Sequence, residues 1–117
     1  MKHDQITALL NNGRRPLWLY KSNLDGAMLK KADLIGAYME KASLKHAELV
    51  EANLSGADLT NADLTNANLN LVNLSGTKLT GAILDECKLE GSKYTAYTVW
   101  PEGFDPAEKG AILRDTH

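Results

Sequence analysis

The sequence predicts an all-β solenoid, and three regularities predict it. From Leu24 to Leu89 an apolar residue recurs at every fifth position without a break. A small residue, most often alanine, stands two positions before each of them, and every glycine between residues 26 and 91 stands two positions after one. A five-residue step leaves about 140° of drift on an α-helix and changes face on a flat strand, so neither buries the series. A chain of short extended segments that bends once per five residues does.

The apolar series is the expected core ladder of this solenoid. Within each segment the small residue and the apolar residue are two apart, so both side chains point inward. The remaining positions are mostly polar, as expected for residues that face water or form a corner, and glycine suits a corner because its backbone is permissive. The ladder consists of Leu24, Leu29, Leu34, Met39, Leu44, Leu49, Leu54, Leu59, Leu64, Leu69, Leu74, Leu79, Leu84 and Leu89.

The N-terminal residues 1–20 are expected to form a capping helix and a lead-in to the first coil. Asp4 is a candidate N-cap, and Asn12 with Gly13 is a stop signal, which predicts a helix over residues 4–11. A helix this short is not stable alone, so it has to pack on the solenoid. Its apolar face would consist of Ile6, Leu9 and Leu10.

The C-terminal residues 96–117 are expected to form an aromatic cap over the last layer of leucines. Asp105 followed by Pro106 predicts a brief helical turn that ends before Gly110. An aromatic docking patch for a partner is the alternative interpretation of the same residues. The large side chains concerned are Tyr94, Tyr97, Val99, Trp100 and Phe104.

The repeat resembles a known family. The segment Ala47–Leu69, AELVEANLSGADLTNADLTNANL, is similar to the A-(D/N)-L-X-X signature of pentapeptide-repeat proteins, and the resemblance covers about residues 22–94. Residues 97–106, YTVWPEGFDP, resemble segments that follow such repeats in cyanobacterial members. The resemblance implies a right-handed quadrilateral parallel β-helix over residues 21–95, with four pentapeptides per coil and about 3.5–4 coils. Stacking of residues twenty apart would then place Asp25 over Lys45 and Lys31 over Glu51.

The sequence offers no residue pattern that indicates catalysis. The three histidines lack partners at metal-ligand spacing, so no metal site is expected. Cys87 replaces an inward alanine, which predicts a buried and unreactive thiol, disfavoured as thiolate by Asp85 and Glu86. If leucine and alanine fill every layer, no interior cavity remains for a substrate. We therefore expect neither an enzyme, a cofactor nor a small-molecule substrate.

The function predicted from the sequence is a rigid scaffold or protein-interaction module with an unknown protein partner. One corner column should form a smooth uncharged strip that packs on a partner or on a second copy, giving a monomer or a weak homodimer. The strip consists of Ile35, Gly36, Ser55, Gly56, Ser75 and Gly76.

The alternative function is a DNA mimic that regulates or inhibits a type II topoisomerase such as DNA gyrase, as in some proteins of this family. That mechanism needs a strongly anionic rod, whereas residues 1–50 carry a net charge of +3 and the whole chain −2. Direct binding of nucleic acid is not expected, because acidic residues are interleaved with the lysines near the first coils. No apolar run suits a membrane span or a signal peptide, so a cytoplasmic location is expected.

Overall fold

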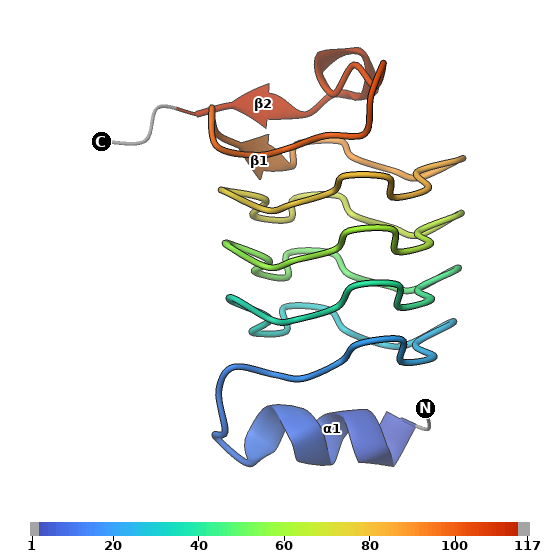
Figure 1. Cartoon of the computed structure of the whole chain (residues 1–117), viewed down its shortest axis with the longest axis vertical. Helices are drawn as coiled ribbons and strands as arrows, with labels where there is room; N and C mark the ends of the chain where they lie inside the picture. Colours follow the sequence, from blue (N-terminus) through green and yellow to red (C-terminus); the bar gives the residue numbers. More distant parts are fainter. Residues whose placement is uncertain (1–2, 115–117) are drawn as a thin grey trace.

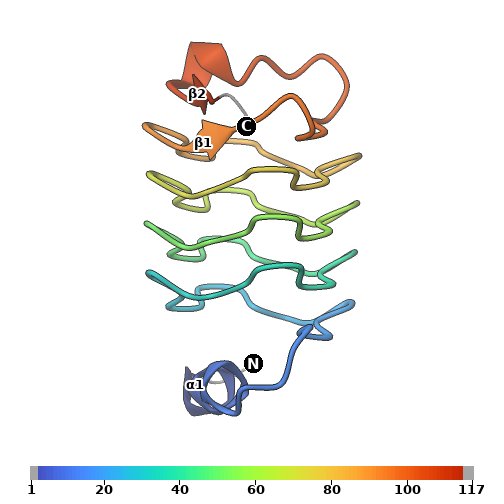
Figure 2. The same cartoon turned by 90° about the vertical axis from the view of Figure 1, so that its left-hand side faces the viewer.

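The computed structural model describes residues 3–114 and consists of stacked coils with a helix at one end (Figure 1). Parallel bridges join residues twenty apart, from Trp18 with Tyr38 up to Asn73 with Lys93. Bridge-forming segments follow one another every five residues, so each coil has four sides and four corners. The structure measures 35 × 30 × 20 Å. Figure 2 shows the same coils from the side, stacked with little offset.

The apolar ladder fills the interior, as predicted. All of its fourteen residues are at most 7% exposed, and most of them are completely buried. The ladder begins earlier than the sequence pattern indicated, because Leu17 and Leu19 are also buried and Trp18 between them already pairs with Tyr38. Part of the lead-in expected over residues 1–20 therefore belongs to the first coil. Leu17 occupies the position of the small residue, which hid this repeat.

The corners between residues 19 and 92 are β-turns of type II. The N–H of Ala27 donates to the carbonyl of Leu24 at 3.0 Å, and Gly26 between them has φ of 68°. Type II turns need a positive φ at the third residue, which explains the glycine positions that the sequence singled out. Other corners place a side chain there, at a cost of about 1–2 kcal/mol each. In the described residues these are Lys21, Lys31, Lys41, His46, Glu51, Asn61, Asn66, Leu71 and Glu86.

The helix α1, His3–Asn11, lies across the N-terminal end of the stack (Figure 1). Ile6 is only 4% exposed, and Leu9 and Leu10 are partly buried against the core. The expected apolar face is therefore the one that packs on the first coil. The prediction that Asp4 is the N-cap is wrong, because the helix already includes His3 and Asp4 lies within it.

The C-terminal tail lies across the other end. Strand β1, Lys93–Tyr94, pairs in parallel with β2, Ile112–Leu113, and the 3₁₀ helix Ala107–Lys109 lies between them. The Asp105 carboxylate accepts the N–H of Ala107 at 3.1 Å, and Gly110 ends the turn, as the sequence predicted.

Only part of the aromatic cluster covers the last layer. Trp100 stacks on Phe104 with centroids 5.3 Å apart and meets the edge of Tyr94 at the same distance. These three side chains pack against the core, whereas Tyr97 is 72% exposed and Val99 also faces outward. The expectation that all five large side chains form one cover is corrected accordingly. The chain gains one residue between β1 and Val99, since Lys78 pairs with Val99 rather than with the residue twenty positions on, and this reorients the tail.

Candidate interaction surfaces

The Asp and Asn residues of the repeat complete the corners from outside. The side-chain oxygen of Asp58 accepts the N–H of Thr60 at 3.0 Å and its hydroxyl at 2.6 Å. This backbone N–H points away from the neighbouring coils, so a side-chain acceptor two residues earlier satisfies it. The sequence pattern indicated only that these positions are on the surface. The same bond is made by Asn23, Asp33, Asn53, Asp63, Asn68 and Asn73.

These hydrogen bonds lower the pKa of at least one carboxylate. The pKa of Asp63 lies below its ordinary value of 3.8, chiefly because the hydroxyl of Thr65 donates to it at 2.6 Å. Burial opposes this shift, and the Thr65 N–H and Lys45 add smaller effects that lower the pKa. A carboxylate held in its ionised form by its own turn is a poor proton donor. Asp63 is therefore a structural group of the turn.

Asp25 contacts Lys45, the residue expected to stack on it, through the lysine's backbone N–H. Asp25 accepts the N–H of Lys45 at 3.0 Å and the hydroxyl of Ser43, so its carboxylate joins two coils without using the lysine ammonium. An ion pair within the described residues joins Arg15 to Asp33 at 3.9 Å, with both side chains partly exposed. Exposed pairs of this kind contribute little to stability.

Cys87 is 6% exposed and lies in the inward position of its segment. Burial raises the pKa of its thiol to about 12, although the nearby Lys109 acts in the opposite direction. The cause is thus desolvation, whereas the sequence suggested the neighbouring carboxylates. The thiol is protonated at neutral pH and has very little exposed surface to react from.

The histidines and acidic residues form no ligand cluster in the part of the chain that is described. No group of three His, Cys, Asp or Glu side chains is placed to hold a metal ion between residues 3 and 114. His46 is exposed at a corner with φ of 60°, and His117 lies outside the described residues. Over the described range, α1 is also far too short to cross a membrane, and no helix there is long and apolar enough to do so.

The expected neutral strip is assembled as one corner column. The N–H of Gly36 donates to the carbonyl of Ser55, and that of Gly56 to the carbonyl of Ser75, both at 2.9 Å. An added Cβ would meet nothing within 4 Å at Gly36 or Gly56. Glycine therefore avoids the strain of a positive φ at these two corners, and the space above it is open.

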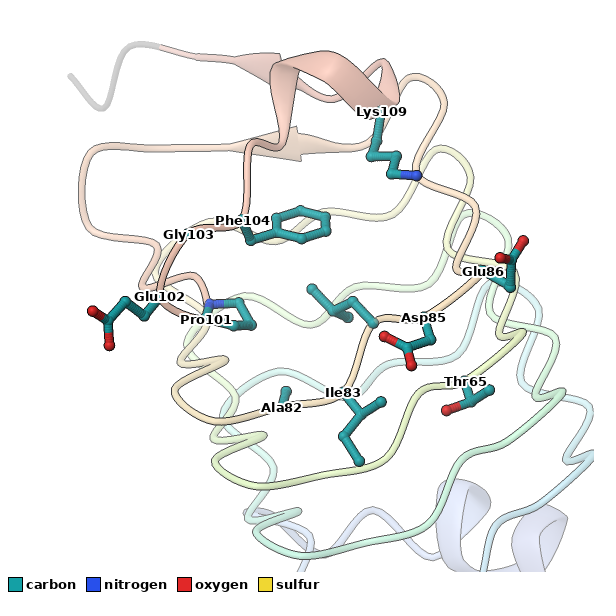
Figure 3. Close-up of a pocket in the computed structure, with 11 residues that line it drawn as sticks. Thr65, Ala82, Ile83, Asp85, Glu86, Pro101, Glu102, Gly103, Phe104 and Lys109 are labelled. Carbon is teal, nitrogen blue, oxygen red and sulfur yellow. The ribbon is translucent and has the colours of Figure 1, made fainter.

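A second surface, which the sequence did not predict, is an open groove of about 940 Å³. It lies between the tail and the side of the coil that carries Ile83 (Figure 3). Residues 82–86 form its floor, residues 101–104 its wall, and Lys109 overhangs it. The expectation that no cavity is available concerned the interior and missed a groove that the tail creates outside. One signal was present in the sequence, since Ile83 stands where the repeat usually has Asp or Asn.

An aromatic ladder marks a third place on the surface. The rings of Trp18 and Tyr38, on neighbouring coils of one side, stack with centroids 4.5 Å apart and planes 8° apart. Trp18 is 74% exposed, and Tyr20 beside it is also exposed, with the Lys21 ammonium 5.3 Å from its ring centre. Mutual stacking accounts for these rings without any partner.

The four-sided solenoid agrees with the comparison to known families. The profile for pentapeptide repeats matches residues 22–61 and 57–93, with eight copies. The chain belongs to the pentapeptide-repeat family. The resemblance stated from the sequence is confirmed, and its solved members imply that the four-sided solenoid is a right-handed quadrilateral β-helix.

Three solved structures illustrate the likeness. A pentapeptide repeat protein from the cyanobacterium Cyanothece 51142 is 42% identical, with a TM-score of 0.70 over 71% of this chain and 56% of its own. One from the thylakoid lumen of Arabidopsis thaliana is 29% identical, with a TM-score of 0.69 over 80% of this chain and 59% of its own. One from Nostoc Pcc 7120 is 32% identical, with a TM-score of 0.50 over 95% of this chain and 94% of its own.

The chain therefore spans under two thirds of the first two of these proteins. A search of curated proteins found no match. The comparisons thus give the family and the fold.

Proposed function

We propose that this pentapeptide-repeat protein is a rigid, non-catalytic module that binds another protein through its outer surface. The observation that carries the proposal is the burial of the whole ladder in the interior, with Leu44, Leu64 and their neighbours fully buried. A close-packed solenoid held by hydrogen bonds between all its coils does not rearrange, so it presents fixed surface columns. Binding to such a surface needs little ordering of the protein itself.

The two ends support this role in the proposal. In this proposal α1, His3–Asn11, and the aromatic tail over residues 96–114 act as caps on a β-helix of about 3.5–4 coils, whose first coil already includes Leu17 and Leu19. Ile6 at one end and Trp100 at the other cover apolar layers that would otherwise be exposed. Capped solenoids stay soluble and do not stack end to end.

The neutral strip from Ile35 to Gly76 is the proposed contact surface. Its backbone corners are smooth and uncharged, so a flat partner surface pays no desolvation of charge on approach. Ile35 is 49% exposed at one end of the strip and supplies an apolar contact. A second copy of this chain or another protein would fit, and the cytoplasmic location expected from the sequence stays a prediction.

The test is an affinity pull-down from the source organism with three forms of the protein. Ser55→Arg places a long charged side chain on the strip, and Thr80→Arg places it at the same repeat position on a different corner. We expect the wild type and Thr80→Arg to retain the same partner and Ser55→Arg to lose it. Equal retention of the partner by all three forms would show that the strip is not the contact surface. Turnover of a substrate by the purified protein would show that the protein is catalytic.

The DNA-mimic alternative lacks a specific observation in its favour. Its mechanism needs carboxylates presented at phosphate-like positions, but Asp33, Asp58 and Asp63 bond to their own turns. Basic residues also crowd the N-terminal half of the chain. A gyrase supercoiling assay decides this point, and inhibition at micromolar protein would restore the alternative.

A further inference from the structure

The groove beside the tail combines an apolar floor with unneutralised acidic groups. Ile83 is 44% exposed on the floor, and Phe104 is half-buried on the wall opposite (Figure 3). Three carboxylates line the groove against one ammonium, that of Lys109. In the described residues no ion pair within 4 Å joins Lys109 to any of them. The carboxylates belong to Asp85, Glu86 and Glu102.

The floor departs from the repeat at the rung that faces the tail. On this side of the solenoid the outward residues of the earlier coils are Asn23, Ser43 and Asp63, all polar, and the fourth is Ile83. The tail does not cover that isoleucine, since nearly half of its surface remains accessible. The apolar side chain therefore does not serve the packing of the tail, and its exposure creates the floor of the groove.

Both walls of the groove are rigid. The N–H of Ile83 donates to the carbonyl of Ala62 at 2.9 Å, and its carbonyl accepts from the N–H of Leu64 at 2.8 Å, which fixes the floor to the preceding coil. On the wall the N–H of Phe104 donates to the carbonyl of Pro101 at 3.1 Å, and the Phe104 ring stacks on Trp100. A preformed groove binds without the entropic cost of ordering its walls.

We propose that this groove binds an extended segment of a partner protein in which arginine or lysine stands beside a large apolar residue. The apolar side chain would lie between Ile83 and Phe104, and the cation would reach Asp85, whose carboxylate lies beside the floor in Figure 3. Nucleic acid and acidic peptides are repelled by the net charge of the rim. The groove is too open to enclose a small molecule, which in a typical pocket has ~70–90% of its surface buried. This inference rests on the proposed function as an interaction module and adds a second surface to it.

The test uses three labelled synthetic peptides of equal length and fluorescence anisotropy. One alternates arginine with leucine, one alternates glutamate with leucine, and one alternates arginine with serine. Only the first should bind the wild type well, and its binding should weaken as salt rises from about 0.05 to 0.5 M. Equal binding of all three peptides, or of none, would overturn the inference.

Two groove variants and two matched controls locate the site. Ile83→Asn and Asp85→Lys should each weaken binding of the arginine–leucine peptide about tenfold or more, which corresponds to ~1.4 kcal/mol. Met28→Asn repeats the first change at the same repeat position on another side, and Glu90→Lys repeats the second on the same coil outside the groove. Both controls should bind like the wild type. If they lose as much affinity as the groove variants, the peptide binds elsewhere and the inference is wrong.

Ile83→Asn is a safe variant because it restores a residue type that the repeat prefers and adds no charge to the groove. The new side-chain oxygen would be placed to accept the N–H two residues ahead, as that of Asn73 does at its own corner. Its melting temperature should be equal to that of the wild type or higher. If the peptide fails to bind while the pull-down still depends on the strip, the groove inference falls and the proposed function stands. If the peptide binds and retention of the partner does not depend on Ser55, the groove inference stands and the strip is not the contact surface.

Discussion

Replacing Leu64 by alanine tests whether the five-residue ladder is what holds the coils together. Leu64 is 0% exposed and lies between Leu44 and Leu84 of the adjoining coils, near the middle of the stack. Alanine would remove three carbon atoms and leave a hole between layers. The hole can close only if neighbouring coils move toward it.

The hydrogen bonds around Leu64 oppose such a movement. Its N–H donates to Ile83 at 2.8 Å, and the N–H of Asp63 donates to Ala42 at 3.0 Å, so this rung is fixed to the coils on both sides. Loss of the buried side chain costs about 2 kcal/mol by transfer, and each Å³ of unfilled cavity adds roughly 24 cal/mol. A site that cannot collapse lies in the upper part of the range, so we expect a loss of about 3–5 kcal/mol.

Urea denaturation followed by circular dichroism measures this loss, and Leu71→Ala is its matched control. Leu71 is 54% exposed at a corner, so the same three atoms are removed from a site in contact with water. The control should lose less than about 1 kcal/mol, as surface substitutions do. Equal losses in the two variants, or a loss below about 1 kcal/mol for Leu64→Ala, would refute the assignment of the ladder as the source of stability.

Three further predictions concern single groups. The pKa of the Cys87 thiol is 9.0 in the unfolded chain and about 12 in the folded one. The wild type should therefore lose stability relative to Cys87→Ala by ~1.4 kcal/mol per pH unit above pH 9.0. Urea denaturation that gives the same difference in unfolding free energy at every pH would contradict this. Thr65→Val should raise the pKa of Asp63 toward 3.8, as measured by NMR of its carboxyl carbon. The variant should also lose less stability than the wild type as pH falls through the folded-state pKa of Asp63. An unchanged pKa would show that the Thr65 hydroxyl does not cause the shift. Trp100→Ala should lower the melting temperature by about 10 °C, because it removes a half-buried ring that packs on Tyr94 and Phe104. An unchanged melting curve would show that the tail does not act as a cap.

The solenoid could be predicted because its signal is periodic and local. An apolar residue at every fifth position has to be buried, and a positive φ is needed at each corner, so Leu24 to Leu89 and the glycines between residues 26 and 91 already specify sides, corners and ladder. The family resemblance added four pentapeptides per coil, and the bridges between residues twenty apart agree with it. Leu17 escaped the pattern because a large residue there replaces the small one.

The candidate surfaces were predicted less completely, because a surface depends on which segments meet in space. The strip at Gly56 follows from the repeat once the family resemblance supplies four pentapeptides per coil, since residues twenty apart then stack. The groove does not, because it needs the tail at Phe104 to fold back beside Ile83, and no spacing in the sequence relates those two residues. Likewise, the role of Asp58 as an acceptor for its own corner depends on which backbone N–H groups the neighbouring coils leave unpaired.

By itself the sequence determined that this chain bends every five residues and coils around a ladder of leucines, since no other path buries them. The tertiary structure decided where the stack begins, how the tail crosses its end and which polar groups remain free at the surface. The physical reason is that burial of a periodic side chain is imposed by the chain's own pattern. Contacts of an irregular tail arise only from packing between residues far apart in sequence.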